Sequence, residues 1–158
     1  MVVLEQLLQG FYTAVDPLNL AWLFGGSLLG TVLGMLPGLG PSTGMALLLP
    51  AVLSLRPDTG LIAMAAIYYG AMFGGSRSSI LLNVPGDRAA VASCLDGYPL
   101  ALNGQAEAAL AISAIASFIG GLIAAGTFVL VALPIARFSL RFGPPESFCL
   151  MVFALAAT

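Results

Sequence analysis

The nine residues Leu36–Gly44, "LPGLGPSTG", interrupt one of the most hydrophobic parts of the chain. Two prolines bracket two glycines, directly after a run long enough to cross a lipid bilayer. Proline cannot continue a helix because it lacks an amide hydrogen, and glycine adopts backbone conformations that other residues avoid. The stretch therefore predicts a break between two helices, at a depth where broken backbone is tolerated only beside protein or a wet cavity.

The composition indicates a membrane protein. Of 158 residues, 59% are hydrophobic and 8% are charged, and the mean hydropathy is +1.04. Soluble domains carry about 25% charged residues. We therefore expect an all-α integral membrane protein, built from several spanning helices with broken or re-entrant segments and forming part of a larger transporter fold.

The charged residues exclude several functions. The net charge is −2, with no histidine and no lysine, so a basic surface for nucleic acid is not expected. A histidine base, a histidine metal site and a Walker lysine are all impossible within this sequence. We expect no enzyme activity, no catalytic residue, no metal site and no organic cofactor.

Two segments precede the break. Residues 1–17 alternate apolar and polar side chains near helical spacing, which predicts an amphipathic segment at the membrane interface. Residues 18–158 are assigned to the transmembrane domain. Asp16-Pro17 signals a helix start, and Leu18–Leu36 would span about 28 Å as a helix. Its small-residue stripe predicts close approach of another helix backbone, and consists of Gly26, Gly30 and Gly34.

A second interruption is expected at Arg77–Asp87, "RSSILLNVPGD". The apolar run Gly60–Gly75 precedes it, and the apolar part Ile80–Val84 is too short to span, which predicts a re-entrant hairpin. Around the first break, Ser42–Leu55 is also short for a span. Further on, Asp96 and Gly97 are interpreted as a turn rather than a functional carboxylate site.

The last part of the chain is expected to contain one long helix. Asn103 is predicted to cap it, and the helix then runs to Ile135 with a second stripe of small residues, Ala116, Gly120 and Ala124. Arg137 and Arg141 mark its end as cytoplasmic by the positive-inside tendency. Phe148–Thr158 is apolar and stops short of a span, so we expect the chain to be the N-terminal portion of a longer protein; the alternative is a helix that does not cross.

Paired broken helices predict a binding site for a substrate anion and a coupling cation, since half-helix N-termini favour anions and unwound carbonyls hold cations. The residues expected to bind the substrate are Pro41, Ser42, Thr43, Ser76, Arg77, Ser78, Ser79 and Asn83, and those expected to bind the ion are Gly38, Leu39, Gly40 and Asn83. Two alternatives stay open: the first break is a simple kink between membrane helices, and Arg77 extends to lipid headgroups instead of a ligand.

Several motifs resemble one known family, the large membrane subunit TctA of the tripartite tricarboxylate transporters. The motifs occur in the family's order from Gly30 onward, and are "GTVLGMLPGLGPSTGMALLLP", "YYGAMFGGS", "ILLNVPGD", "CLDGYPLALNGQAEAAL" and "FGPPESF". One departure is Arg77, where the family pattern leads us to expect an uncharged residue after "GGS". This arginine would either tune carboxylate recognition or mark a copy that no longer transports.

The resemblance implies a multi-pass permease of the bacterial inner membrane that imports tricarboxylates or related organic acids. It implies an ion gradient, Na⁺ or H⁺, as the energy source. The implied partners are a small membrane subunit, TctB-like, and a periplasmic solute-binding protein, TctC-like, besides the lipid bilayer. The alternative function is a truncated or degenerate membrane scaffold that does not transport.

Overall fold

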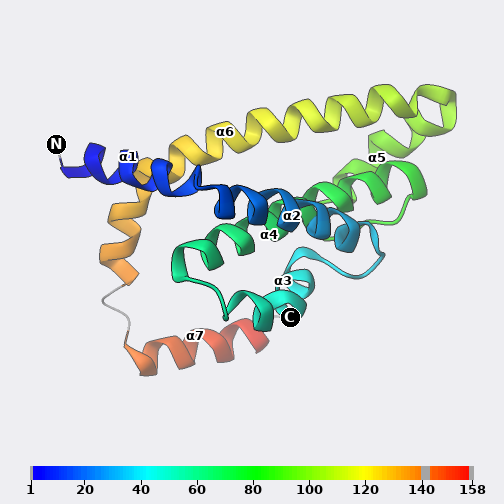
Figure 1. Cartoon of the computed structure of the whole chain (residues 1–158). Coiled ribbons are helices and arrows are strands. Elements are labelled where there is room, and N and C mark those ends of the chain that lie inside the picture. The colour runs from blue at the N-terminus through cyan, green and yellow to red at the C-terminus, as the bar shows by residue number, and fades with distance from the viewer. Residues whose placement is uncertain (1, 140–142, 157–158) are drawn as a thin grey trace. The chain divides into compact units, whose positions relative to one another are not determined.

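The computed structural model describes residues 2–139 and 143–156, and every regular element in these two ranges is helical (Figure 1). The elements are α1 (Val2–Ala14), α2 (Pro17–Met35), α3 (Pro41–Val52), α4 (Pro57–Leu82), α5 (Val91–Leu100), the π-helical turn η1 (Ala101–Gln105), α6 (Ala106–Ser139) and α7 (Pro144–Ala156). The chain divides into two units, Met1–Ile115 and Ala116–Thr158.

Helices α2 and α4 form the centre of the first unit and run parallel to each other (Figure 1). Helix α3 leads the chain from the end of α2 back to the start of α4. The glycine stripe of α2 packs closely on another helix backbone, as predicted, and the structure shows that this helix is α4. Gly30 faces Ile67 and Ala71, and Gly34 faces Ala71 one turn further along. A side chain at either glycine would overlap the α4 backbone, so the parallel pairing depends on their lack of a Cβ atom.

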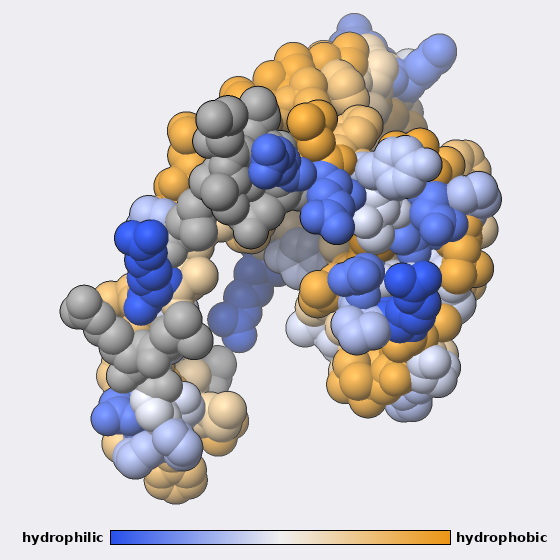
Figure 2. All heavy atoms as spheres, turned by 60° about the vertical axis from the view of Figure 1, so that its left-hand side comes forward, coloured by the Kyte–Doolittle hydropathy of each residue, from blue (hydrophilic) through white to orange (hydrophobic). Residues whose placement is uncertain are grey.

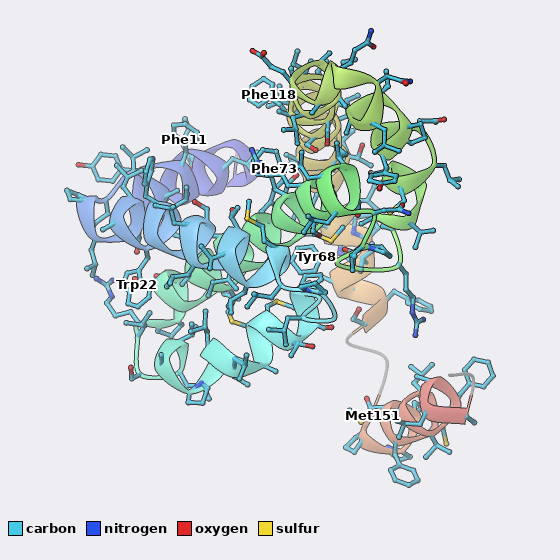
Figure 3. The ribbon with its side chains drawn as sticks, turned by 90° about the vertical axis from the view of Figure 1, so that its right-hand side faces the viewer. Phe11, Trp22, Tyr68, Phe73, Phe118 and Met151 are labelled. Carbon is cyan, nitrogen blue, oxygen red and sulfur yellow. The ribbon has the colours of Figure 1, made fainter. Side chains whose placement is uncertain are left out.

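The apolar core of the first unit lies where α2, α3 and α4 meet. Val52, Ala63 and Ile67 are buried there, and Trp22 of α2 packs against them (Figure 3). The predicted helix start at Asp16 is confirmed, because its carboxylate accepts a hydrogen bond from the Leu18 amide. Since α2, α3 and α4 all begin with proline, their first turns contain one fewer amide hydrogen to satisfy.

The predicted re-entrant hairpin is wrong. Helix α4 continues without a break through Gly75 and Ser76–Ser79 and ends only at Leu82. The serine hydroxyls bond to carbonyls of the preceding turn, so these polar residues are compatible with a continuous helix. The break comes at Asn83, whose φ of 56° lies in the left-handed region.

Two further expectations are corrected. Asp96 and Gly97 lie inside α5 rather than in a turn. Gly97 permits close packing there, because a Cβ at this position would lie 2.7 Å from Cγ1 of Ile80.

Asn103 does not cap the long helix. It lies in η1, and the chain changes direction at Gly104, whose φ is 79°. The following helix α6 extends to Ser139, beyond the predicted Ile135. Arg141 lies outside the described residues.

Much of the surface is apolar, and Figure 2 shows hydrophobic residues over large parts of the visible face. By length and composition, two helical stretches of the described chain could cross a membrane, Pro17–Met35 and the α5–η1–α6 run Val91–Ala132. In the second unit, Phe118 and Met151 are exposed (Figure 3), and a Cβ at Gly120 would meet nothing within 4 Å. Within the described part of this unit, the predicted second stripe therefore has no close helix partner at Gly120.

Candidate functional site

The two Pro-Gly segments, far apart in sequence, meet at the C-terminal end of α2. A Cβ at Gly40 would lie 3.5 Å from the Gly86 carbonyl oxygen, an ordinary contact distance. Gly86 itself lies against both central helices: its Cβ would be 2.5 Å from Cα of Gly75 and 2.8 Å from the carbonyl oxygen of Gly34. Only a glycine at position 86 lets the second segment lie on the helix pair beside the first.

An open hollow of about 480 Å³ lies where these segments meet. Its lining comes from the first break and the start of α3, from one face of α4, and from the segment after Asn83. The lining residues are Gly38, Gly40, Pro41, Ser42, Thr43, Tyr68, Met72, Gly86, Asp87, Arg88 and Ala89. Five of the residues predicted from the first break therefore share one hollow with the second Pro-Gly segment.

The start of α3 supplies one wall. Its cap residue, Gly40, carries no side chain to accept hydrogen bonds, and the described structure records no partner for the amides of Ser42 and Thr43. The N-terminus of a helix carries about half a positive charge, and free amides there favour an anion. The preceding Gly38 has a φ of +82°, so the turn into this wall requires a left-handed residue.

The segment after Asn83 adds two charged residues to the lining. Arg88 is exposed beside Asp87, whose Oδ1 accepts a hydrogen bond of 2.7 Å from the Ala90 amide. That bond fixes the backbone after Gly86. Asp87 and Arg88 were not predicted as site residues, although both directly follow the Pro-Gly pair of the second segment. Tyr68 and Met72 were missed because nothing in the sequence shows which face of α4 lines the hollow.

The predicted site residues on α4 do not line this hollow. The hydroxyls of Ser78 and Ser79 both donate to the Gly75 carbonyl, at 2.9 and 2.8 Å, and both side chains are buried. Ser76 donates to Met72 within the same helix. These serines therefore satisfy their hydroxyls within α4 and do not line the hollow.

Arg77 is also separate from the hollow. Its guanidinium lies over the Phe73 ring, 3.5 Å from the centroid, in a cation–π contact. One guanidinium nitrogen, Nη1, is buried without a hydrogen-bond partner among the described residues. Part of the guanidinium is thus enclosed by the protein, and the described residues provide no carboxylate paired with it.

Asn83 ends α4. Its amide donates to the Ser79 carbonyl, its backbone is left-handed, and its side chain is exposed outside the hollow. Of the predicted ion ligands, the Gly40 carbonyl accepts the first helical bond of α3, from Gly44. The carbonyls of Gly38 and Leu39 precede the helix. In the described ranges no group of three or more Cys, Asp or Glu residues could hold a metal ion.

Comparison with known proteins gives one family and one relative. The model of the "Tripartite tricarboxylate transporter TctA family" matches residues 20–158. The chain is 44% identical over 155 residues to the "Uncharacterized 52.8 kDa protein in TAR-I ttuC' 3'region" of Agrobacterium vitis. That alignment covers 98% of this chain and 31% of the relative, so the chain spans about a third of the relative's length. No solved structure matches.

Proposed function

Because the chain belongs to the tripartite tricarboxylate transporter TctA family, we propose that it forms the N-terminal part of a permease subunit that imports tricarboxylates or related small organic acids. The observation that supports this most directly is the meeting of the two Pro-Gly segments around one hollow. Transporters commonly bind substrates where helices are interrupted. A scaffold without transport is not favoured by the family match.

The hollow has the chemistry to hold a carboxylate. The free amides of Ser42 and Thr43 lie at the positive end of α3, and Arg88 lines the same hollow. Arginine binds carboxylates through two parallel hydrogen bonds, which fixes orientation as well as charge. We therefore assign substrate contact to Pro41, Ser42, Thr43 and Arg88. The residues Ser76–Ser79 and Asn83 do not line the hollow and are assigned no substrate contact.

The proposed energy source is an ion gradient, Na⁺ or H⁺. The carbonyls of Gly38 and Leu39, next to the left-handed turn, are the backbone oxygens that a coupling cation would use, since Gly40 is engaged in the helix. Unwound carbonyls beside a half-helix are a recurrent cation site in secondary transporters.

The proposed setting is the bacterial inner membrane, which the permease crosses several times. The apolar surfaces of α2 and α6 support membrane insertion. Residues 1–17 would lie at the interface, and 18–158 would belong to the transmembrane domain. A TctB-like small membrane subunit and a TctC-like periplasmic binding protein are the proposed partners.

The test is uptake of labelled carboxylates by the full-length protein with both partners in proteoliposomes. Replacing Arg88 by Gln should raise the substrate concentration for half-maximal uptake about tenfold or more, because a charged hydrogen bond is lost. Arg88→Lys should lose less. Glu107→Gln, which neutralises one exposed charge on α6, is the matched control. Unchanged uptake in Arg88→Gln would remove Arg88 from the site, and absence of uptake by the native protein with any di- or tricarboxylate would contradict the proposed function.

A further inference from the structure

A second cavity lies at the other end of the helix pair, about 28 Å from the hollow along the 19 residues of α2. It has a volume of about 360 Å³ and is bounded by the last turn of α1 and the first turns of α2 and α4. The lining residues are Tyr12, Thr13, Val15, Asp16, Pro17, Leu18, Asn19, Arg56, Asp58 and Thr59. The proposed transport function uses none of them.

Asn19 is the decisive side chain of this cavity. It is only 4% exposed, and its Nδ2 donates a hydrogen bond of 2.7 Å to the Thr13 carbonyl at the end of α1. That bond fixes which way the amide points, because an oxygen could not face the carbonyl. The amide oxygen, Oδ1, is consequently enclosed and has no hydrogen-bond partner in the described part of the chain. A buried acceptor of this kind requires a donor or a cation.

The other polar side chains that line this cavity supply mainly oxygen atoms. Thr59 is 3% exposed and brings a hydroxyl, while Asp16 and Asp58 bring carboxylates. One oxygen of Asp16 is already used by the Leu18 amide. Among the described residues that line the cavity, Arg56 carries the one opposing charge. The C-terminal end of α1 carries a partial negative charge, which offsets part of the positive ends of α2 and α4.

We propose that this cavity binds a monovalent cation, Na⁺, with Oδ1 of Asn19 and the hydroxyl of Thr59 among its ligands. All-oxygen sites select hard cations. A divalent ion is disfavoured because the described residues contain no cluster of three acidic groups, and Arg56 cancels one of the two charges present. The cation would join α1, α2 and α4 at one point and would stabilise the fold whether or not the protein transports.

The experiment uses the purified 158-residue chain in detergent micelles at constant ionic strength. Thermal unfolding is followed in NaCl, KCl and choline chloride, and binding is followed directly by the line width of the ²³Na NMR signal. We expect Na⁺ to raise the unfolding midpoint by about 5–10 °C when it exceeds its dissociation constant about 100-fold. The signal should broaden in the presence of the chain and not of empty micelles.

Two variants locate the effect. Asn19→Leu and Thr59→Val should each remove the Na⁺-dependent shift and the broadening, whereas Thr127→Val, which removes an exposed hydroxyl on α6, should keep both. If Asn19→Leu does not fold, Thr59→Val decides alone. Equal midpoints in NaCl and choline chloride without broadening would overturn the proposal. Persistence of the Na⁺ effect in Thr59→Val would overturn it by placing the ion elsewhere.

Discussion

Gly34 of α2 lies directly against Ala71 of α4, so close that a Cβ at Gly34 would come within 2.7 Å of the Ala71 Cα atom. The same contact recurs one turn earlier at Gly30, and in the opposite sense at Gly70, which faces Ser27 and Thr31. Glycines on both helices therefore interlock along the pair. In a lipid environment such packing, rather than hydrophobic burial, holds helices together.

The first prediction concerns this interface. Gly30→Ala should destabilise the chain by about 1–3 kcal/mol, because the added methyl group would lie 2.9 Å from the Ile67 carbonyl carbon and force the helices apart. Gly25→Ala is the matched control on the same helix, since a Cβ there meets nothing within 4 Å. Thermal unfolding in detergent micelles provides the measurement. Equal midpoints for the two variants would show that α2 and α4 are not packed as described.

The second prediction concerns the contact between the two Pro-Gly segments. Gly86→Ala should displace the second segment from the helix pair, because its methyl group would overlap Gly75 and Gly34. Gly40→Ala should be tolerated, with its Cβ 3.5 Å from the Gly86 oxygen and 3.9 Å from the Asp87 side chain. Uptake by the full-length protein should fall at least about tenfold in Gly86→Ala, if the displaced wall costs about 1.4 kcal/mol of substrate binding. A larger loss in Gly40→Ala would reverse this assignment.

The sequence was sufficient to predict the structure at positions where a residue type has a single structural consequence. Proline and glycine at Leu36–Gly44 predicted the first break, and the four-residue spacing of Gly26, Gly30 and Gly34 predicted a helix packed at close range. Both results follow from local chemistry, namely a missing amide hydrogen and a missing Cβ atom. Which helix would lie on the stripe was not predictable, because the partner residues of α4 are spread over two turns and include alanine and isoleucine.

The region from α4 to α5 was predicted less well, because small and polar residues occur both in irregular backbone and in closely packed membrane helices. Ser78, Ser79 and Gly97 were interpreted as signs of irregular backbone, yet they lie in helices. Serine satisfies its hydroxyl on the preceding turn, and glycine admits a neighbouring side chain. Only the tertiary contacts distinguish these roles. Arg88 and Tyr68 likewise could be assigned to the site only from the tertiary structure, which places both in the lining of the hollow.

The third prediction separates two roles of Asn83. The residue ends α4 in a left-handed conformation, which glycine adopts more easily than alanine. Asn83→Ala should therefore lower the free energy of unfolding by about 1 kcal/mol, whereas Asn83→Gly should preserve it. If the side-chain amide binds the coupling ion, both variants should lose ion-dependent uptake. Normal uptake in Asn83→Gly with impaired folding of Asn83→Ala would restrict Asn83 to its role in ending the helix.

The last prediction concerns Arg77. A buried guanidinium nitrogen without a partner costs about 1–3 kcal/mol, while the stacking on Phe73 returns about 0.5–1 kcal/mol. Arg77→Met keeps most of the side-chain length without the charge, so we expect the free energy of unfolding to rise by about 1 kcal/mol. Arg77→Lys, which keeps the charge but loses the planar stacking group, should be less stable than the native chain.

Uptake measurements on Arg77→Met distinguish an arginine that is only unfavourably buried from one that binds substrate. If Arg77 contributes only this unfavourable burial, the methionine variant of the full-length protein should transport normally. If the free nitrogen binds a substrate carboxylate, uptake should be lost while the unfolding midpoint stays at or above that of the native chain. A marked fall in the midpoint of Arg77→Met would contradict the energetic argument itself, because it would require a hydrogen-bond partner for Nη1 that the described residues do not provide.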